Sequence, residues 1–549
     1  MGQVKGLAPH ETLFARITIA FSFVILALGG LFGLLQALNR IPYFELPGFL
    51  QVSRETYYTI LTCHGVCLAV AIPIFWATGF TAYLAPKILG RSLNKTMVYL
   101  SLVMMLVGAV MATIATLTGN ARVLYTFYAP MKAHPAFYLG AALLILGSWV
   151  LAFAFFAQYI GWRKANPGKG TPIAIYGLLT TFIVWIEATI PIVITVLKDF
   201  IPMSLFNKPV DVLETRTWFW FFGHALVYFW LLPVVTMWYY AIPKRLGVPL
   251  FSESMAKIAF ILFIIASTPV GLHHQFTDPG LAAGYKYLHT VITLVVATPS
   301  MLTAFNILAT MERGGRARGG KGLLGWLWKQ PWKDPLYAGL VVTLIVFGIG
   351  GITGIINASY QLNIVVHNTT WIVGHFHMTV ATIVAVGYAA TTYALLKDLY
   401  GRKLISRVAA LGHPYLWLIG ILVFSFSYYI AGLEGVPRRT YNLEYGGLAP
   451  ESWIGVMQTS AIGSLILFAS GVLAVYAILG SLLFGKSRGY EIVGLNPGNP
   501  HDPPAGFNPI LENLKLWIIV AAILIIVAYI LPFYEIFSRG LSPVPPIEV

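Results

Sequence analysis

The chain has 549 residues, of which 58% are hydrophobic and 10% are charged, and its mean hydropathy is +0.77. This composition excludes a soluble globular protein, because a chain so poor in charged residues could not cover its surface with polar groups. The net charge of +15 does not indicate a nucleic-acid-binding protein, because the basic residues lie mainly in alternate loops between apolar segments.

Apolar stretches of about 20 residues or more recur along the chain, each long enough to cross the hydrocarbon core of a bilayer. Backbone polar groups in lipid must bond to one another, so these stretches predict transmembrane helices. We therefore expect an all-α, polytopic bundle of about 13 spans that forms one domain over residues 1–549. The spans are expected near 13–38, 57–86, 96–118, 137–162, 172–197, 217–242, 254–276, 287–312, 334–357, 369–397, 413–432, 457–485 and 515–538.

The loops after the even-numbered spans, counted with the adjoining span ends, carry 22 Lys and Arg, against 10 in the alternate loops between spans. Basic loops stay on the cytoplasmic side of a membrane. The sequence therefore predicts a multi-pass protein of the inner (plasma) membrane, with a cytoplasmic N-terminus and an external C-terminus. Glu11 precedes the first span and no small-residue cleavage site follows it, which predicts a retained helix. The loop at 486–514, rich in Pro, Gly and Asn, is expected to be irregular and on the inner side.

Six histidines lie at membrane depth, where polar side chains cost free energy and usually mark a functional site. They are His64, His224, His273, His274, His375 and His377. With a rise of about 1.5 Å per residue, the predicted topology places all six at a similar level in the outer half of the membrane. One histidine at this depth often only bonds to a neighbouring helix, but six at one level predict a shared site.

Two of these histidines, His375 and His377, occur in the segment WIVGHFHMTV at 371–380. Positions two apart on an α-helix are rotated by roughly 200°, so the two imidazoles project from opposite faces of one span. They cannot bind one small ion together, but each can serve a large cofactor on its own side of the helix. Neutral imidazole is a usual axial ligand of haem iron. The pair therefore predicts two haems, one on each side.

The other four histidines suggest two further features. His64 could pair with His375 or His377 in a six-coordinate haem suited to electron transfer. Three imidazoles on adjacent spans suit copper or zinc, and a metal facing the open side of a five-coordinate haem would create a pocket for a small diatomic molecule. These three are His224, His273 and His274. Tyr228 follows the first of them by four residues and shares its helix face, where a phenol could supply a proton and an electron.

Four motifs occur in order along the chain: HALVYFWLLP at 224–233, STPVGLHHQF at 267–276, VVHNTTWIVGHFHM at 365–378 and GVPRRTYN at 435–442. In this order and spacing they resemble subunit I of the haem–copper oxygen reductases, and most closely the B family. The resemblance covers essentially the whole chain, and the set is specific where one motif would be weak. It implies a terminal respiratory oxidase that reduces O₂ to water and couples this reaction to proton uptake and pumping.

The resemblance also implies roles for the six histidines. His64 and His377 match the axial ligands of a low-spin haem, expected to be of b type, and His375 matches the proximal ligand of a high-spin haem, expected to be of a type. One copper ion is expected on three histidines, His224, His273 and His274. Tyr228 matches the tyrosine that the family links covalently to the first copper ligand, so Tyr228 and that histidine are the expected catalytic residues.

Four residues match the region that holds haem propionates in the family. Arg438 and Arg439 match the propionate-binding pair, consistent with bidentate contacts between guanidinium and carboxylate groups. His367 and Asn363 fall in the same region. Asn363 stands where the family leads us to expect an aspartate, so this position departs from the family pattern.

A line of polar residues predicts a single proton path from the inner side towards Tyr228. Span six lacks the glutamate that A-family oxidases place one turn from this tyrosine. The polar residues are Ser252, Tyr239, Asn306, Thr303 and Ser300. Each hydroxyl alone could equally bond back to its own helix, and it is their rise along spans six, seven and eight that favours a path.

The resemblance implies partners that this chain does not contain. Electrons are expected from a cytochrome c through a subunit II with a di-copper centre, and a small accessory helix subunit is possible. O₂ is the expected substrate, membrane lipid surrounds the spans, and no nucleic acid is expected.

Two other functions remain open from the residues. Nitric oxide reduction uses the same six histidines with iron in place of copper, but it needs glutamates near that metal, and span six offers only Tyr228. A secondary transporter would need broken helices or intramembrane carboxylates at mid-depth. Only Glu187 stands out as an acidic residue within a span, and the sequence gives it no role.

Overall fold

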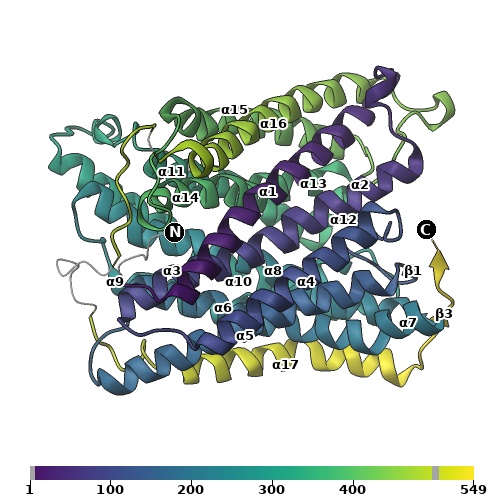
Figure 1. The fold of residues 1–549 in the computed structure, drawn as a ribbon. Helices are drawn as coiled ribbons and strands as arrows, with labels where there is room; N and C mark the ends of the chain where they lie inside the picture. Colours follow the sequence, from purple (N-terminus) through teal and green to yellow (C-terminus); the bar gives the residue numbers. More distant parts are fainter. Residues whose placement is uncertain (1–5, 487, 498–505, 549) are drawn as a thin grey trace.

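The computed structural model describes residues 6–486, 488–497 and 506–548, and it consists mainly of long helices that run side by side (Figure 1). Within the described residues, 12 helices are long and apolar enough to cross a membrane. The α-helices are α1 Pro9–Asn39, α2 Arg54–Val66, α3 Ile72–Leu89, α4 Lys95–Leu117, α5 Pro135–Ala165, α6 Ile173–Thr195, α7 Ile201–Phe206, α8 Val212–Leu246, α9 Glu253–Ala266, α10 Ala283–Ala317, α11 Pro335–Ala358, α12 Tyr360–Val366, α13 Thr370–Phe376, α14 Tyr388–Asp398, α15 Arg407–Leu433, α16 Ser452–Phe484 and α17 Leu514–Ser538.

The predicted all-α membrane bundle is confirmed, but the predicted span at 254–276 is wrong as a continuous helix. Helix α9 ends at Ala266 after 14 residues, and the chain then forms a short 3-10 helix, η4, at Gly271–Gln275. Pro269 lacks the amide hydrogen that an α-helix would need at its position. The predicted span therefore ends in a turn, and this turn carries His273 and His274.

Several spans contain short π-helical segments that join two α-helices into one span. They are η2 Cys67–Ala71 between α2 and α3, η3 Val196–Phe200 between α6 and α7, and η6 His377–Ala381 with η7 Ile383–Gly387 between α13 and α14. Such π-turns are rare and often occur at functional sites. Two of these segments adjoin predicted haem ligands, because His64 lies three residues before η2 and His377 begins η6.

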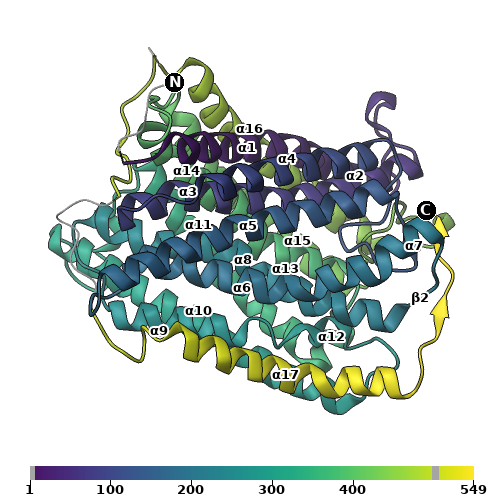
Figure 2. The same cartoon turned by 60° about the horizontal axis from the view of Figure 1, so that its bottom comes forward.

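The centre of the bundle is formed by α8 and by the span that joins α13 to α14. In each of these two spans, 94% of the residues in an apolar 18-residue stretch are buried inside the protein, whereas the buried share in α17 is 28%. Helix α17 lies along one side of the bundle beside α9 and α10 (Figure 2). The two spans that carry His224, Tyr228, His375 and His377 are thus shielded from lipid, while α17 is peripheral.

Four short strands mark one end of the bundle, which we call the strand end. Strand β1 (Met131–Lys132) pairs in parallel with β4 (Ile547–Glu548), and β2 (Val210–Asp211) pairs antiparallel with β3 (Pro543–Val544). The Asp211 carboxylate accepts hydrogen bonds from Glu214 N and from Ser542 N, each at 2.8 Å. Asp211 therefore caps α8 and also holds the chain that follows α17.

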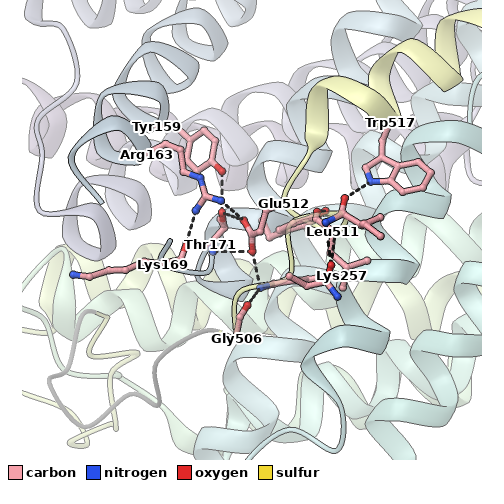
Figure 3. Close-up of polar contacts among 12 residues, drawn as sticks. Tyr159, Arg163, Lys169, Thr171, Lys257, Gly506, Leu511, Glu512 and Trp517 are labelled. Carbon is pink, nitrogen blue, oxygen red and sulfur yellow. Dashed lines mark hydrogen bonds and ion pairs between the residues drawn. The ribbon is translucent and has the colours of Figure 1, made fainter. Parts of the chain in front are cut away.

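At the opposite end of the bundle, Glu512 anchors the segment that leads into α17 (Figure 3). Its buried carboxylate accepts hydrogen bonds from Thr171 N at 3.0 Å, Thr171 Oγ1 at 2.6 Å and Lys257 Nζ at 2.9 Å. Arg163 lies 3.5 Å from the same carboxylate. The described residues between the end of α16 and the start of α17 form no helix, in agreement with the predicted irregular loop at 486–514. Residues 487 and 498–505 of that predicted loop lie outside the described residues.

Candidate metal and cofactor site

All six histidines predicted at membrane depth line one internal cavity of about 850 Å³. They come from four parts of the fold: α2 supplies His64, α8 supplies His224, the turn after α9 supplies His273 and His274, and the α13–η6 span supplies His375 and His377. The predicted shared site is therefore present as one cavity, and this volume is in the range of cofactor-binding cavities.

The imidazoles of His64 and His377 face a common space. Their rings are nearly parallel, at 13°, and their centroids are 6.1 Å apart. His64 Nδ1 donates to the Gly29 carbonyl at 2.8 Å, and His377 Nδ1 donates to the Val373 carbonyl at 2.9 Å. These bonds leave each Nε2 as a basic nitrogen. Two metal–nitrogen bonds of about 2 Å and the two ring radii would fill this separation, so His64 and His377 are the residues that would hold one haem iron between them.

Gly33 on α1 is part of the same arrangement. A Cβ atom at this position would lie 2.7 Å from His64 Cε1, well inside van der Waals contact. The absence of a side chain thus allows α1 to approach the imidazole and fix its plane. The α1 carbonyl of Gly29, one turn earlier, receives the Nδ1 hydrogen bond of the same ring.

His375 points to the other side of its span, as the two-residue spacing predicted. Its Nδ1 contacts the Gly350 carbonyl at 3.1 Å and Thr353 Oγ1 at 3.0 Å, both on α11. His377 instead packs on Phe424 of α15, with ring centroids 5.0 Å apart. The π-helical turns that begin at His377 do not bring the two imidazoles together. His375 therefore has a free Nε2 for a second cofactor on the α11 side.

His224, His273 and His274 form the one group of three or more potential metal ligands found among the described residues, with ligand atoms within 4.8 Å of one another. His224 Nδ1 lies 3.2 Å from His274 Nε2. His273 Nδ1 donates to Thr293 Oγ1 at 3.0 Å, which leaves its Nε2 free. Three converging neutral imidazoles fit a copper ion.

Tyr228 lies beside this cluster. Its hydroxyl is 3.2 Å from His224 Nε2, the nitrogen that does not face His274. The predicted i,i+4 relationship on α8 thus brings the phenol to the edge of the histidine group. Trp220 stacks on the opposite part of the cluster, parallel to His274 within 9° and with centroids 3.9 Å apart. A phenol and an indole therefore flank the three imidazoles.

Two arginines lie at the strand end of the cavity. Arg439 donates to Tyr125 OH at 3.0 Å, and Arg438 donates to Asn368 Oδ1 at 2.9 Å. Arg439 Nε is buried without a hydrogen-bond partner, and neither guanidinium pairs with a carboxylate of the described chain. Burial and the charge of Arg439 lower the pKa of Arg438 to about 10. Two half-buried cations without anionic partners fit the carboxylates of a cofactor.

His367 and Asn363 lie at the same end. His367 Nδ1 donates to Asn363 Oδ1 at 3.1 Å, and Asn363 Nδ2 donates to the Asn357 carbonyl at 2.7 Å. Burial, followed by the positive charge of Arg438, lowers the pKa of His367 to about 4. His367 is therefore neutral near pH 7 in the protein chain alone.

Comparison with known proteins identifies the family. The family model for cytochrome C and quinol oxidase polypeptide I matches residues 14–466. The chain belongs to this family. Cytochrome c oxidase subunit 1 of Thermus thermophilus is 36% identical over 544 residues, covering 96% of this chain and 95% of the relative. Quinol oxidase subunit 1 of Sulfolobus acidocaldarius is 26% identical and covers 74% and 81%, respectively. A cryo-EM structure of a heme-copper terminal oxidase dimer matches with a TM-score of 0.92 at 34% identity, covering 99% of this chain and 96% of that chain.

This oxidase subunit I is thus an oxidoreductase of the haem–copper kind and a multi-span membrane protein with terminal oxidase function. Membership of the family implies haems and copper as cofactors, oxygen as substrate and a subunit II as partner. The transporter alternative is set aside, because transport would leave the three-histidine cluster without a purpose.

Two pairs of the residues that were predicted to form a proton path are hydrogen-bonded to each other. Tyr239 OH donates to Thr303 Oγ1 at 2.8 Å. Ser252 bonds to Asn306 through its backbone, with its N donating to Asn306 Oδ1 at 3.1 Å. Ser300 lines the cavity that Tyr228 also lines. The Ser252 hydroxyl itself is engaged as the N-cap of α9, where it accepts from Met255 N.

Glu187, the carboxylate without an assigned role, contacts the segment between α9 and η4 that leads into the histidine turn. Its Oε2 accepts a hydrogen bond from Thr268 Oγ1 at 3.3 Å. Its Oε1 is buried and has no hydrogen-bond partner among the described residues. Glu187 does not line the cavity.

Three residues that contact the oxidase histidines were missed by the sequence analysis. Thr353 and Thr293 receive the Nδ1 hydrogen bonds of His375 and His273. Both threonines lie on helices that approach only in the folded protein, so no local motif could reveal them. The third, Trp220, is four residues before His224, and this spacing on one helix face was a usable signal.

Proposed function

We propose that His64 and His377 hold a low-spin haem, of b type, and that His375 holds a high-spin haem, of a type. The observation that carries this proposal is the separation of the histidines around one cavity, with a facing pair on one side of the α13–η6 span and a single imidazole on the other. Arg438, Arg439, His367 and Asn363 would hold the propionates of these haems.

His224, His273 and His274 would hold one copper ion across the cavity from His375. When bound, the metals would supply the reduction of O₂ to water. Tyr228 would donate a proton from its hydroxyl, because the hydroxyl reaches the edge of the copper site and contacts His224 Nε2 at 3.2 Å. His224 and Tyr228 are therefore the proposed catalytic residues.

Tyr239 and Thr303 would pass protons towards Tyr228, and Ser252, Asn306 and Ser300 would extend this path at its two ends. The Tyr239–Thr303 hydrogen bond supports the proposal. The loop charges support a cytoplasmic N-terminus and an external C-terminus, so protons would enter from the inner side of the plasma membrane. Proton consumption from one side, with electrons from the other, moves charge across the membrane, and we propose that proton pumping adds to it.

Electrons would come from a cytochrome c through a subunit II with a di-copper centre. The name of the Thermus thermophilus relative, a cytochrome c oxidase subunit, supports this donor. A small accessory helix subunit would complete the complex. Membrane lipid would surround the transmembrane spans.

Metal analysis combined with reduced and reduced-plus-CO optical spectra of the purified protein tests the proposal. We expect two haems and one copper per chain, with only one haem binding CO. Two haems with additional non-haem iron and no copper would instead indicate a nitric oxide reductase. Absence of haem would overturn the assignment of all six histidines.

A further inference from the structure

The turn that carries His273 and His274 has unusual backbone requirements. Helix α9 ends at Ala266, and regular hydrogen bonding resumes only in η4, at Gly271–Gln275. Irregular backbone at membrane depth is tolerated only where other groups satisfy its amides and carbonyls. The first two amides of η4, Gly271 N and Leu272 N, each donate to a side chain rather than to a carbonyl. These two side chains, from α17 and α10, therefore determine where the turn lies.

The first of these side chains is Tyr529 of α17. Its hydroxyl accepts from Gly271 N at 2.8 Å and lies 3.3 Å from the Thr268 carbonyl, to which it donates. One phenol thus joins both sides of the irregular segment. The ring is held parallel to Phe221 of α8, within 7° and with centroids 4.0 Å apart. The Tyr529 ring is therefore held by packing on α8, and its hydroxyl is held by hydrogen bonds to the turn.

Gly271 shows how closely the turn is held between α8 and α17. A Cβ atom at this position would lie 2.2 Å from the Trp220 carbonyl oxygen on α8 and 2.5 Å from Tyr529 OH on α17. The same Trp220 stacks on His274. Only glycine allows the backbone to fit between these two helices. Because the backbone contacts both helices directly, a shift of either one would displace the turn.

The second side chain is His289 of α10, which is completely buried. Its Nδ1 accepts from Leu272 N at 3.3 Å, and its Nε2 donates to the Ala528 carbonyl of α17 at 3.1 Å. Its own carbonyl accepts from Thr293 Oγ1, the hydroxyl that receives the Nδ1 hydrogen bond of His273. His289 thus connects α17 both to the turn and to a copper-ligand imidazole.

We infer that Tyr529 and His289 are positioning residues that hold His273 and His274 in place for copper, so that the peripheral helix α17 is a structural part of the copper site. The inference rests on the proposed assignment of copper to the three histidines. Neither residue lines the cavity. Both act through the backbone of the turn and, for His273, through Thr293. Groups that orient metal ligands in this way typically change metal affinity by 10- to 100-fold when they are replaced.

The test is copper retention by the purified holoenzyme. Wild type, Tyr529→Phe and Tyr534→Phe are reduced and exposed to a Cu(I) chelator, and the copper-to-haem ratio is followed over time. Tyr529→Phe removes one hydroxyl and keeps the ring on Phe221, whereas Tyr534 is 69% exposed on the same helix and serves as the matched control. We expect Tyr529→Phe to lose copper about 10-fold faster, with unchanged haem content and an unchanged low-spin haem spectrum.

Copper loss at the wild-type rate in Tyr529→Phe would overturn the inference. A wild-type protein that carries haem but no copper would overturn the copper assignment itself, and the inference with it, so the two failures are distinguishable. If Tyr529→Phe cannot be purified with haem, His289→Asn is measured in the same way and decides the question, because it alters the second support and keeps Tyr529.

Discussion

The imidazole planes of His64 and His377 are parallel within 13°, with 6.1 Å between their centroids, although the two residues lie on different helices and far apart in the sequence. Each ring is oriented by one backbone carbonyl, from Gly29 and from Val373. Hydrogen bonds of this kind fix the tautomer of a metal-binding imidazole. The two imidazoles are thus already oriented in the protein chain itself as the proposed low-spin haem would require.

Replacement of His377 by Ala should abolish the low-spin haem signal, because an axial ligand is lost. The CO-binding haem should remain, since His375 projects to the α11 side and keeps its contact with Thr353. Reduced and reduced-plus-CO optical spectra give both signals. Survival of both signals in the variant would show that the assignment of His377 is wrong.

Gly33→Ala tests the same haem without removing a ligand. The added methyl group would lie 2.7 Å from His64 Cε1, so we expect the low-spin haem band to shift or lose intensity. Gly284→Ala is the control, because a Cβ atom at this position meets nothing within 4 Å. A normal low-spin spectrum in Gly33→Ala would mean that the plane of His64 is not set by its contact with α1.

Thr303→Val should slow turnover by about 10-fold or more without altering either haem spectrum. The substitution keeps the volume of the side chain and removes the hydroxyl that accepts from Tyr239 OH. Oxygen consumption is measured together with optical spectra. Thr459→Val is the control, since Thr459 is an exposed threonine that bonds back to its own helix. An unchanged rate would remove Thr303 from the proton path.

Arg438→Gln should lower the midpoint potential of the nearer haem by tens of millivolts, on the order of 1 kcal/mol. The loss of a positive charge disfavours the added electron of the reduced haem. A redox titration followed optically measures this change. Arg54→Gln at an exposed position is the control. If both variants titrate like the wild type, Arg438 is not close to a haem.

Glu512→Gln should destabilise the protein by about 3–5 kcal/mol, the range for removing one partner of a buried ion pair. The Glu512 side chain is 2% exposed, and its loss leaves Lys257 and Arg163 with less compensating charge. Thermal unfolding in detergent measures the effect. Glu491→Gln removes a 67% exposed partner of Lys403 and should leave the unfolding temperature unchanged. Equal unfolding temperatures for both variants would contradict the proposed anchoring role of Glu512.

The sequence was sufficient where the relevant spacing is local. The i,i+4 relationship of His224 and Tyr228 and the divergence of His375 from His377 both follow from helix geometry alone, and both are confirmed. The grouping of all six histidines followed from the topology, which sets the depth of each span. Pro269 and Gly271 are local signals for the break after Ala266, although the high hydropathy of this segment predicts a continuous span.

The contacts that orient the histidines could not be predicted. Thr353 and Thr293 reach their partners from separate helices, and a single threonine in an apolar span has no periodic signal. The same holds for Tyr529, which lies 258 residues after Gly271. Glu512 was assigned to an irregular loop, and nothing in its neighbourhood indicated that it would be buried against Lys257.

The long separation between Gly271 and Tyr529 has a consequence for biosynthesis. The histidine turn is synthesised 258 residues before the phenol that accepts the hydrogen bond of its first amide. Until α17 has been inserted, Gly271 N and the Thr268 carbonyl lack their partner at membrane depth. The three-histidine cluster therefore reaches the geometry described above only once α17 is packed against the turn.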